Sequence, residues 1–295
     1  MAAIWGRQNE SGAVKMKLLV TGAAGMLGRD VLLAAGNAGH DVVGYGRAEL
    51  DVTNPEALAR KLDLERPDVV VNCAAWTDVD GAEQAEEQAF AINGKGAGNV
   101  AAAAAEVEAR VVHVSTDYVF DGAKGAPYVE SDQPAPRSAY ARTKLAGEEA
   151  VAAANKRHFI VRSAGLYGLG GRNFVDTMLR LAEAQNEVTV VRDQVTSPTY
   201  TWHLAYGIVR LIEGIEYGIH HMAAAGHCSW YEFAREIFEQ AKVECRVLSI
   251  TSEEFGAAAP RPAFSALVSQ REHAIRLPTW QDGLAGYLAQ RQAEL

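Results

Sequence analysis

Cysteine is scarce in this sequence, and long apolar runs are lacking. The 295 residues hold only Cys73, Cys228 and Cys245, too few and too scattered for a disulfide framework or a zinc site. No stretch approaches the roughly 18 to 20 apolar residues of a membrane span, and residues 1–15 lack the apolar core of a secretory signal. We therefore expect a cytoplasmic protein with no membrane partner. Since Met16 directly precedes the first predicted strand, residues 1–15 are expected to be a leader or a disordered extension.

The chain is also short of positive charge, with 28 Lys and Arg against 37 Asp and Glu and a net charge of −9. Nucleic-acid binding needs a basic surface, so no nucleic-acid partner is expected. A small anion stays open, because a few local Arg or Lys side chains suffice for a diphosphate. The composition, 48% hydrophobic and 22% charged, is that of a globular protein. The length suits one large α/β unit with a smaller companion.

Short β-branched runs alternate with alanine-rich amphipathic segments in the first 170 residues. The predicted strands are residues 17–21, 41–45, 68–72, 110–115 and 159–162. Helical patterns cover 26–35 and 55–62, extend to about residue 105 after the third strand, and resume after Ser138. This alternation favours right-handed βαβ crossovers and a parallel sheet covered on both faces. The predicted fold class is α/β: a Rossmann-type doubly wound parallel sheet with a smaller, partly interleaved C-terminal substrate domain.

The pattern loosens after residue 170, which sets the expected domain division. Residues 16–170 plus about 196–219 are predicted to form a dinucleotide-binding domain, and about 171–195 plus 220–295 a substrate domain. The aromatic-rich segment 230–238 has helical spacing and is interpreted as core. His220 and His221, with His227, are interpreted as a polar surface turn and not as a metal site.

The first strand runs into the glycine loop Gly22, Gly25 and Gly28, and a helix follows. Glycines let the backbone turn tightly against a pyrophosphate, and the helix N-terminus offers free N–H groups. A purely structural turn is the alternative, but the position after the first strand of a βαβ series favours a dinucleotide. Arg47 follows the second strand, with no carboxylate before Glu49. An arginine there suits a 2′-phosphate, so NADPH is favoured; NADH stays open, because Arg47 could also be a surface charge.

Tyr140 and Lys144 form a Y-x-x-x-K pair one helical turn apart, and Thr116 follows the fourth strand. Ketone reduction requires a proton for the developing alkoxide. An ammonium within about 4–6 Å lowers the pKa of a tyrosine from about 10, and a threonine hydroxyl can stabilise the same oxygen. Alone, the pair is more often a surface helix pair. Its position after the glycine loop and a strand-end Thr predicts a reductase.

The motifs are similar to those of extended short-chain dehydrogenase/reductases, and most of all to the dTDP-4-dehydrorhamnose reductase family. The resemblance covers nearly the whole chain from Met16 and includes KLLVTGAAGMLG, VVHVSTDYVFDG, YARTKLAGE, GLGGRNFVDTMLRLA and RPAFSAL. It implies NADPH-dependent reduction of the 4-keto group of a dTDP-sugar, dTDP-4-dehydro-β-L-rhamnose, to dTDP-β-L-rhamnose.

The resemblance also assigns roles to individual residues. The implied catalytic residues are Thr116, Tyr140 and Lys144, the last two also contacting the cofactor. The implied cofactor contacts are Gly22, Gly25, Met26, Leu27, Asp51, Val52, Ala74, Ala75, Trp76 and Thr77. The implied substrate contacts are Thr77, Val79, Thr116, Asp117, Tyr140, Asn173, Arg261 and Ser265.

Two departures from the family pattern concern substrate recognition. Gly165 stands where the family usually has Trp, so an aromatic wall of the sugar pocket is missing. Phe264 stands where the family usually has Asn. A 4-ketoreductase for another dTDP-deoxysugar is therefore an alternative; a sugar epimerase and a cofactor-binding regulatory subunit are less favoured. A homodimer is left open. Some members use Mg²⁺, but no carboxylate cluster in the sequence assigns a metal site.

Overall fold

The structure is a computed structural model that describes residues 14–294. The expected leader therefore lies outside the described residues, apart from its last two positions. Within residues 14–294, no helix has both the length and the apolar character needed to cross a membrane.

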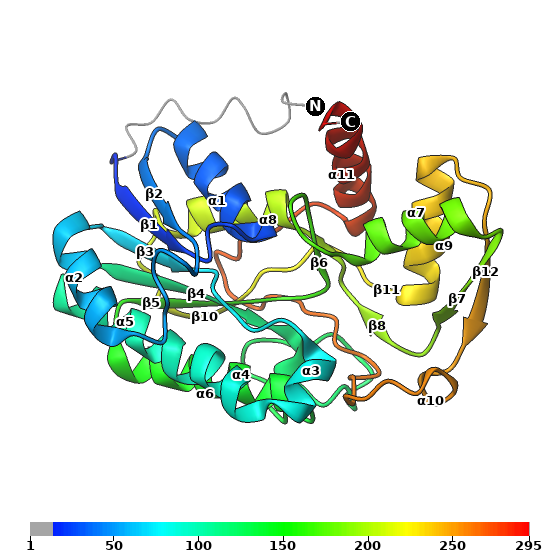
Figure 1. Ribbon diagram of the computed structural model, residues 1–295, viewed down its shortest axis with the longest axis horizontal. Helices are drawn as coiled ribbons and strands as arrows, with labels where there is room; N and C mark the ends of the chain where they lie inside the picture. Colours follow the sequence, from blue (N-terminus) through cyan, green and yellow to red (C-terminus); the bar gives the residue numbers. More distant parts are fainter. Residues whose placement is uncertain (1–13, 295) are drawn as a thin grey trace.

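A six-stranded sheet forms the larger lobe, with strand order β10-β5-β4-β3-β1-β2 and parallel pairing throughout (Figure 1). Its strands are β1 (Lys17–Thr21), β2 (Asp41–Tyr45), β3 (Val69–Asn72), β4 (Arg110–Thr116), β5 (His158–Ser163) and β10 (Gly218–His221). Because β2 and β3 lie on opposite sides of β1, the order in which successive strands are added to the sheet reverses at β1. Such a reversal leaves a crevice at the carboxyl ends of the strands. The predicted doubly wound α/β architecture is confirmed.

Both faces of this sheet are covered because successive strand residues point in opposite directions. Leu18 and Val20 pack with α1 (Met26–Asn37) and α8 (Thr201–Leu211). Leu19, between them, packs with α2 (Pro55–Glu65), α5 (Ala97–Glu106) and α6 (Ala139–Ala154) on the other face. Each fully buried leucine contributes about 1.5–3 kcal/mol relative to exposure.

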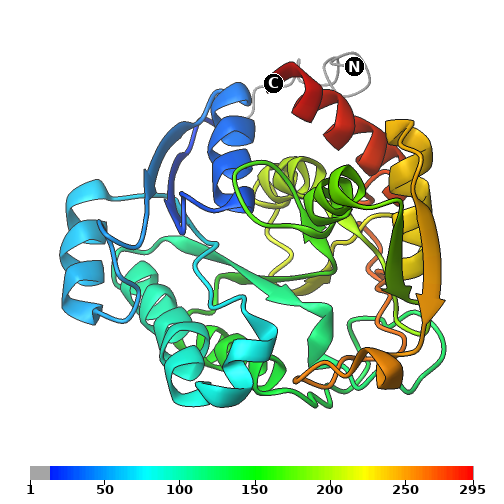
Figure 2. The same cartoon turned by 45° about the vertical axis from the view of Figure 1, so that its right-hand side comes forward.

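The smaller lobe takes its core from three stretches of chain, 167–200, 224–238 and 280–288. Its helices are α7 (Phe174–Ala184), α9 (Trp230–Ala241), α10 (Ser252–Phe255) and α11 (Trp280–Glu294). Its strands form three pairs: β6 (Leu166–Tyr167) with β9 (Thr199–Tyr200), β7 (Glu187–Val191) with β12 (Arg246–Ile250), and β8 (Val195–Thr196) with β11 (Cys228–Ser229). In Figure 2 the green β7 and the orange β12 run side by side. The chain therefore passes repeatedly between the lobes, as the expected interleaving requires.

Two features of the chain differ from the sequence-based expectation. His220 and His221, interpreted as a polar surface turn, belong to β10 and are 7% and 4% exposed. The domain boundary expected at about residue 220 consequently falls inside a strand of the main sheet. The long helical pattern after β3 is divided into α3 (Val79–Gln84), α4 (Glu86–Phe90), a π-helical stretch (Ala91–Gly96) and α5.

Candidate active site

A cavity of about 720 Å³ lies at the carboxyl ends of the central strands and extends to the smaller lobe. Strand register brings its residues together, since Thr116 pairs with Ser163, and Thr21, which directly precedes Gly22, pairs with Asn72. Most of the residues expected at the site line this cavity: Gly22, Gly25, Met26, Leu27, Arg47, Asp51, Val52, Ala74, Ala75, Thr77, Val79, Thr116, Asp117, Tyr140, Lys144 and Ser265.

The glycine loop packs too closely for side chains. Gly22 has φ +67°, and a Cβ on it would lie 2.6 Å from the backbone nitrogen of Ala74. A Cβ on Gly28 would lie 2.4 Å from the Gly22 carbonyl oxygen. Gly25 at the N-cap offers no side chain to the first N–H groups of α1. The loop thus leaves a helix N-terminus open to the cavity, which fits a pyrophosphate.

Arg47 lies at the rim of the cavity, where its side chain is 80% exposed. Its Nε is 3.8 Å from a carboxylate oxygen of Asp51. Asp51 in turn accepts hydrogen bonds from the backbone N–H and the hydroxyl of Thr53, and these bonds hold its pKa below the usual value. A cation is therefore available at the end of β2, where a 2′-phosphate would lie.

Tyr140 is half-buried at the start of α6 and beside Thr116. The sequence predicted that Lys144 would lower the tyrosine pKa. In the structure burial raises the pKa of Tyr140 to about 12, while a hydrogen bond with Thr116 opposes the rise. The phenol therefore carries its proton at neutral pH, which is the form that protonation of a substrate oxygen needs.

Lys144 is 2% exposed and points toward β4, where its Nζ donates to the Val114 carbonyl (2.7 Å) and lies 3.4 Å from His113 Nε2. The amide oxygen of Asn72 accepts from the backbone N–H of Ala74, so its amide nitrogen faces His113 Nδ1 at 3.2 Å. Nδ1 then accepts, and the neutral imidazole keeps its proton on Nε2, facing the amine. Burial lowers the pKa of Lys144 to about 8 and that of His113 well below its usual range.

A buried ion pair lies behind the catalytic side chains. Arg162 on β5 donates to both oxygens of Glu148 on α6, at 3.0 Å from Nε and 2.7 Å from Nη2. The two side chains are 1% and 4% exposed. The Ser115 hydroxyl donates to the same carboxylate. Glu148 therefore connects the helix that carries Tyr140 to the strand end that precedes Thr116.

Asp117 is 2% exposed and accepts hydrogen bonds from the hydroxyls of Ser265, Thr196 and Thr116. Burial raises the pKa of this carboxyl to about 6, although the three hydroxyls oppose the rise. Through these hydrogen bonds the Asp117 carboxyl joins η2 (Asp117–Val119) to β8 and to the segment before α11, and residues of all three line the cavity.

Comparison with known proteins agrees with this geometry. The family model described as the RmlD substrate binding domain matches residues 16–293. A dTDP-4-dehydrorhamnose reductase of Mycobacterium tuberculosis is 42% identical over 284 residues, covering 92% of each chain. The chain belongs to the dTDP-4-dehydrorhamnose reductase family.

Two further relatives of this reductase family are informative. A crystal structure of dTDP-4-dehydrorhamnose reductase from Bacillus anthracis in complex with NADP has a TM-score of 0.91 and 39% identity, covering 94% of this chain and 100% of that one. A dTDP-4-keto-6-deoxy-D-glucose reductase of Streptomyces niveus is 42% identical over 251 residues, covering 84% and 87% of the two chains.

Three residues implied by the resemblance to the reductase family have their polar groups engaged elsewhere and do not line the cavity. Asn173 caps α7, and its amide donates to the Gly168 carbonyl at 3.0 Å. Arg261 forms a two-point ion pair with Asp80, at 2.8 and 3.1 Å. The Trp76 indole donates to the Asp78 carbonyl. In this structure the polar groups of these three side chains already have partners within the protein.

Two residues with evident positions at this reductase-family site were not anticipated. Asn93, in the π-helical stretch, hydrogen-bonds the backbone N–H and carbonyl of Trp76 and the hydroxyl of Thr143 on α6. Trp230, interpreted as core, lines the cavity. The asparagine stood in an unbroken helical pattern and carried no signal. The tryptophan belongs to an amphipathic helix in which Phe233 and Phe238 are indeed buried, while Tyr231 is half-buried.

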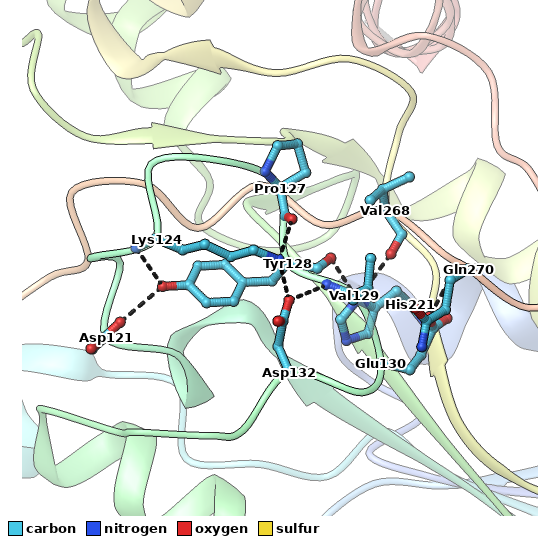
Figure 3. Close-up of polar contacts among 10 residues, drawn as sticks. All are labelled: Asp121, Lys124, Pro127, Tyr128, Val129, Glu130, Asp132, His221, Val268 and Gln270. Carbon is cyan, nitrogen blue, oxygen red and sulfur yellow. Dashed lines mark hydrogen bonds and ion pairs between the residues drawn. The ribbon is translucent and has the colours of Figure 1, made fainter.

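The segment that carries Ser265 is fastened to the connection between η2 and α6 (Figure 3). Tyr128 donates through its hydroxyl to Asp121 (2.8 Å), and its carbonyl accepts from the Val268 N–H (2.9 Å). Glu130 accepts from the backbone N–H groups of His221 and Gln270. These bonds join β10 and two loops on one side of the cavity, so Ser265 has a fixed support.

Proposed function

We propose that this protein uses NADPH to reduce the 4-keto group of dTDP-4-dehydro-β-L-rhamnose, giving dTDP-β-L-rhamnose. The observation that carries the proposal is the convergence of Thr116, Tyr140 and Lys144 on one cavity that begins at an open helix N-terminus. NADP in the related Bacillus anthracis reductase and the name of the Mycobacterium tuberculosis relative support it.

The dinucleotide fits the part of the cavity under the glycine loop, where any Cβ on Gly22 or Gly28 would collide with backbone. Gly22, Gly25, Met26 and Leu27 would hold the pyrophosphate, and Arg47 the 2′-phosphate. When bound, the reduced nicotinamide supplies hydride to the carbonyl carbon.

The chain's own residues supply the proton and hold the charge. Tyr140 keeps its phenolic proton at neutral pH and gives it to the carbonyl oxygen. The Thr116 hydroxyl, which donates to Asp117 in this structure, would turn to donate to the same oxygen as negative charge develops. The ammonium of Lys144, fixed against β4 by the Val114 carbonyl, favours the phenolate that remains.

A second candidate is reduction of another dTDP-4-keto-6-deoxyhexose. Gly165 and Phe264 depart from the family pattern at substrate positions, and the Streptomyces niveus relative is named for a different sugar. The stereochemistry of the product by NMR distinguishes the two, because it reports which face of the carbonyl received hydride. A cytoplasmic location and a homodimer remain expectations from the sequence. The regulatory-subunit alternative predicts a stable hetero-complex without ketoreductase activity.

The test is NADPH oxidation with the dTDP-4-keto sugar by wild type and by Tyr140→Phe. We expect kcat to fall by about 10²–10⁴-fold in the variant, because the proton donor is removed. Tyr206→Phe, on α8 and outside the cavity lining, is the matched control and should keep wild-type turnover. Full activity of Tyr140→Phe would show that another group protonates the substrate.

A further inference from the structure

The end of the cavity beside Asp117 has an aromatic wall, formed by Trp230 at the first residue of α9. We propose that this indole, held against the bare backbone of Gly165, is the surface that receives the sugar ring and sets which sugar is accepted. The inference rests on the proposed function and adds the specificity-determining residue to it.

The backbone that carries the indole is fixed by its own helix, and the ring is held by packing. Ser229 begins α9 with a capping box, in which its hydroxyl accepts from the Glu232 N–H and Glu232 accepts from the Ser229 N–H. The backbone N–H of Trp230 donates to the backbone carbonyl of Gln194, next to β8. Phe174 packs behind the ring, with centroids 4.7 Å apart. A ring held in this way by backbone and packing is ready to bind before the ligand arrives.

Gly165 leaves the room that the indole needs. Its φ is +52°, a left-handed conformation that favours glycine. A Cβ there would lie 3.3 Å from Trp230 Cη2 and 3.2 Å from Pro198 Cα. Even one methyl group is thus tight, and a longer side chain would have to displace the indole. The two positions therefore act as a pair.

The groups around the indole match the two kinds of surface that a deoxyhexose presents. Asp117, Thr196 and Ser265 line this cavity with a carboxylate and two hydroxyls that are hydrogen-bonded to one another, and the lone pairs that remain on these oxygens can accept from sugar hydroxyls. The indole offers an apolar face to ring C–H groups and a methyl group. Arg172, which also lines the cavity, is a cation of the kind that a diphosphate needs, and the apolar indole face is left for the sugar ring.

The pyrimidine base of the same ligand could also stack on an indole, so the experiment must separate base from sugar. We would measure kcat, the KM values of the keto sugar and of NADPH, and the inhibition constant of dTDP alone. The variants are Trp230→Phe and Trp230→Leu. Trp202→Leu, a change of the same type on α8 and outside the cavity lining, is the matched control.

We expect Trp230→Leu to raise the KM of the keto sugar about 3- to 10-fold, the size of an aromatic contact. Trp230→Phe should lie between it and wild type. The dTDP inhibition constant and the NADPH KM should stay within about twofold. An unchanged sugar KM, or an equal loss of dTDP affinity, overturns the proposal; the latter outcome assigns the indole to the base.

Gly165→Ala tests the pairing. It should raise the sugar KM in wild type and raise it less when combined with Trp230→Leu, because coupled neighbours are not additive. If the strained alanine prevents folding, the Trp230 variants still decide. If wild type does not oxidise NADPH, the proposed reaction fails. Calorimetric binding of the dTDP-deoxysugar against dTDP then tests the wall separately, and an equal loss of both affinities in Trp230→Leu rejects it.

Discussion

Replacing Glu148 by Gln would leave the Arg162 guanidinium charged, 1% exposed and without its carboxylate. Breaking a buried ion pair on one side costs about 3–5 kcal/mol, because the remaining charge has lost its partner in a poorly solvated site. Two hydrogen bonds of 3.0 and 2.7 Å and the bond from Ser115 depend on this carboxylate, which places the cost toward the upper end. With an m-value near 3 kcal/mol/M, the urea midpoint should fall by about 1 M or more.

The assay is urea unfolding followed by circular dichroism, for Glu148→Gln, Arg162→Met and the double variant. The double variant removes both charges, so we expect it to be less destabilised than the sum of the single variants by about 3 kcal/mol. The control is Arg142→Met, which breaks an ion pair between Arg142 and Glu86 that is 46% exposed on both sides and should cost under about 1 kcal/mol. Additive losses at Glu148 and Arg162 would refute the reasoning.

Three further predictions concern pH and the glycine loop. The pKa of Lys144 is lowered to about 8, so the ammonium is lost and kcat falls as pH rises above about 8. His113→Phe removes the Nε2–H that faces the Lys144 amine, so the pH at which kcat of this variant falls should move upward. An unchanged pH–kcat profile contradicts the assignment of the His113 proton to Nε2. Burial raises the pKa of Asp30, which has an unpartnered carboxylate oxygen, to about 6. The Asp30 carboxyl is protonated in both the folded and the unfolded protein below about pH 4, and it is ionised in both above about pH 6. Asp30→Asn should therefore raise the free energy of unfolding by up to about 3 kcal/mol at pH 8 and by little at pH 4, measured by urea unfolding. An equal gain at both pH values counts against this reasoning. Gly28→Ala places a Cβ 2.4 Å from the Gly22 carbonyl oxygen, so the NADPH Kd from fluorescence titration should rise by at least about 10-fold, and unchanged binding would mean that the loop opens freely.

The sequence predicted those parts of the fold that depend on neighbours along the chain. Each strand from β1 to β5 is a short apolar run that includes β-branched residues and stands next to a helical pattern. The loop after β1 can make its tight turn only because glycines stand at positions 22 and 28. β10 was missed because Gly218–His221 is four residues long, contains two histidines and becomes a strand only by pairing with β5. Local pattern carries no information about such pairing.

The same distinction explains the candidate site. Tyr140, Lys144 and Thr116 were found from spacing and from their place at a strand end. That Arg261 is engaged by Asp80, or that the Tyr140 pKa is raised and not lowered, depends on which groups the tertiary structure buries together. Trp230 shows the limit most clearly, because helical spacing marks one face of α9 as apolar but cannot say that the first residue of that face borders a cavity.

The late position of β10 in the chain has a consequence for synthesis on the ribosome. β5 ends at Ser163, but the strand that covers its outer edge begins only at Gly218. Until about sixty further residues have been translated and have left the exit tunnel, the emerging sheet ends in an uncovered strand that can pair with another chain. Translation pauses between these two points should therefore lower the yield of folded protein more than pauses after His221.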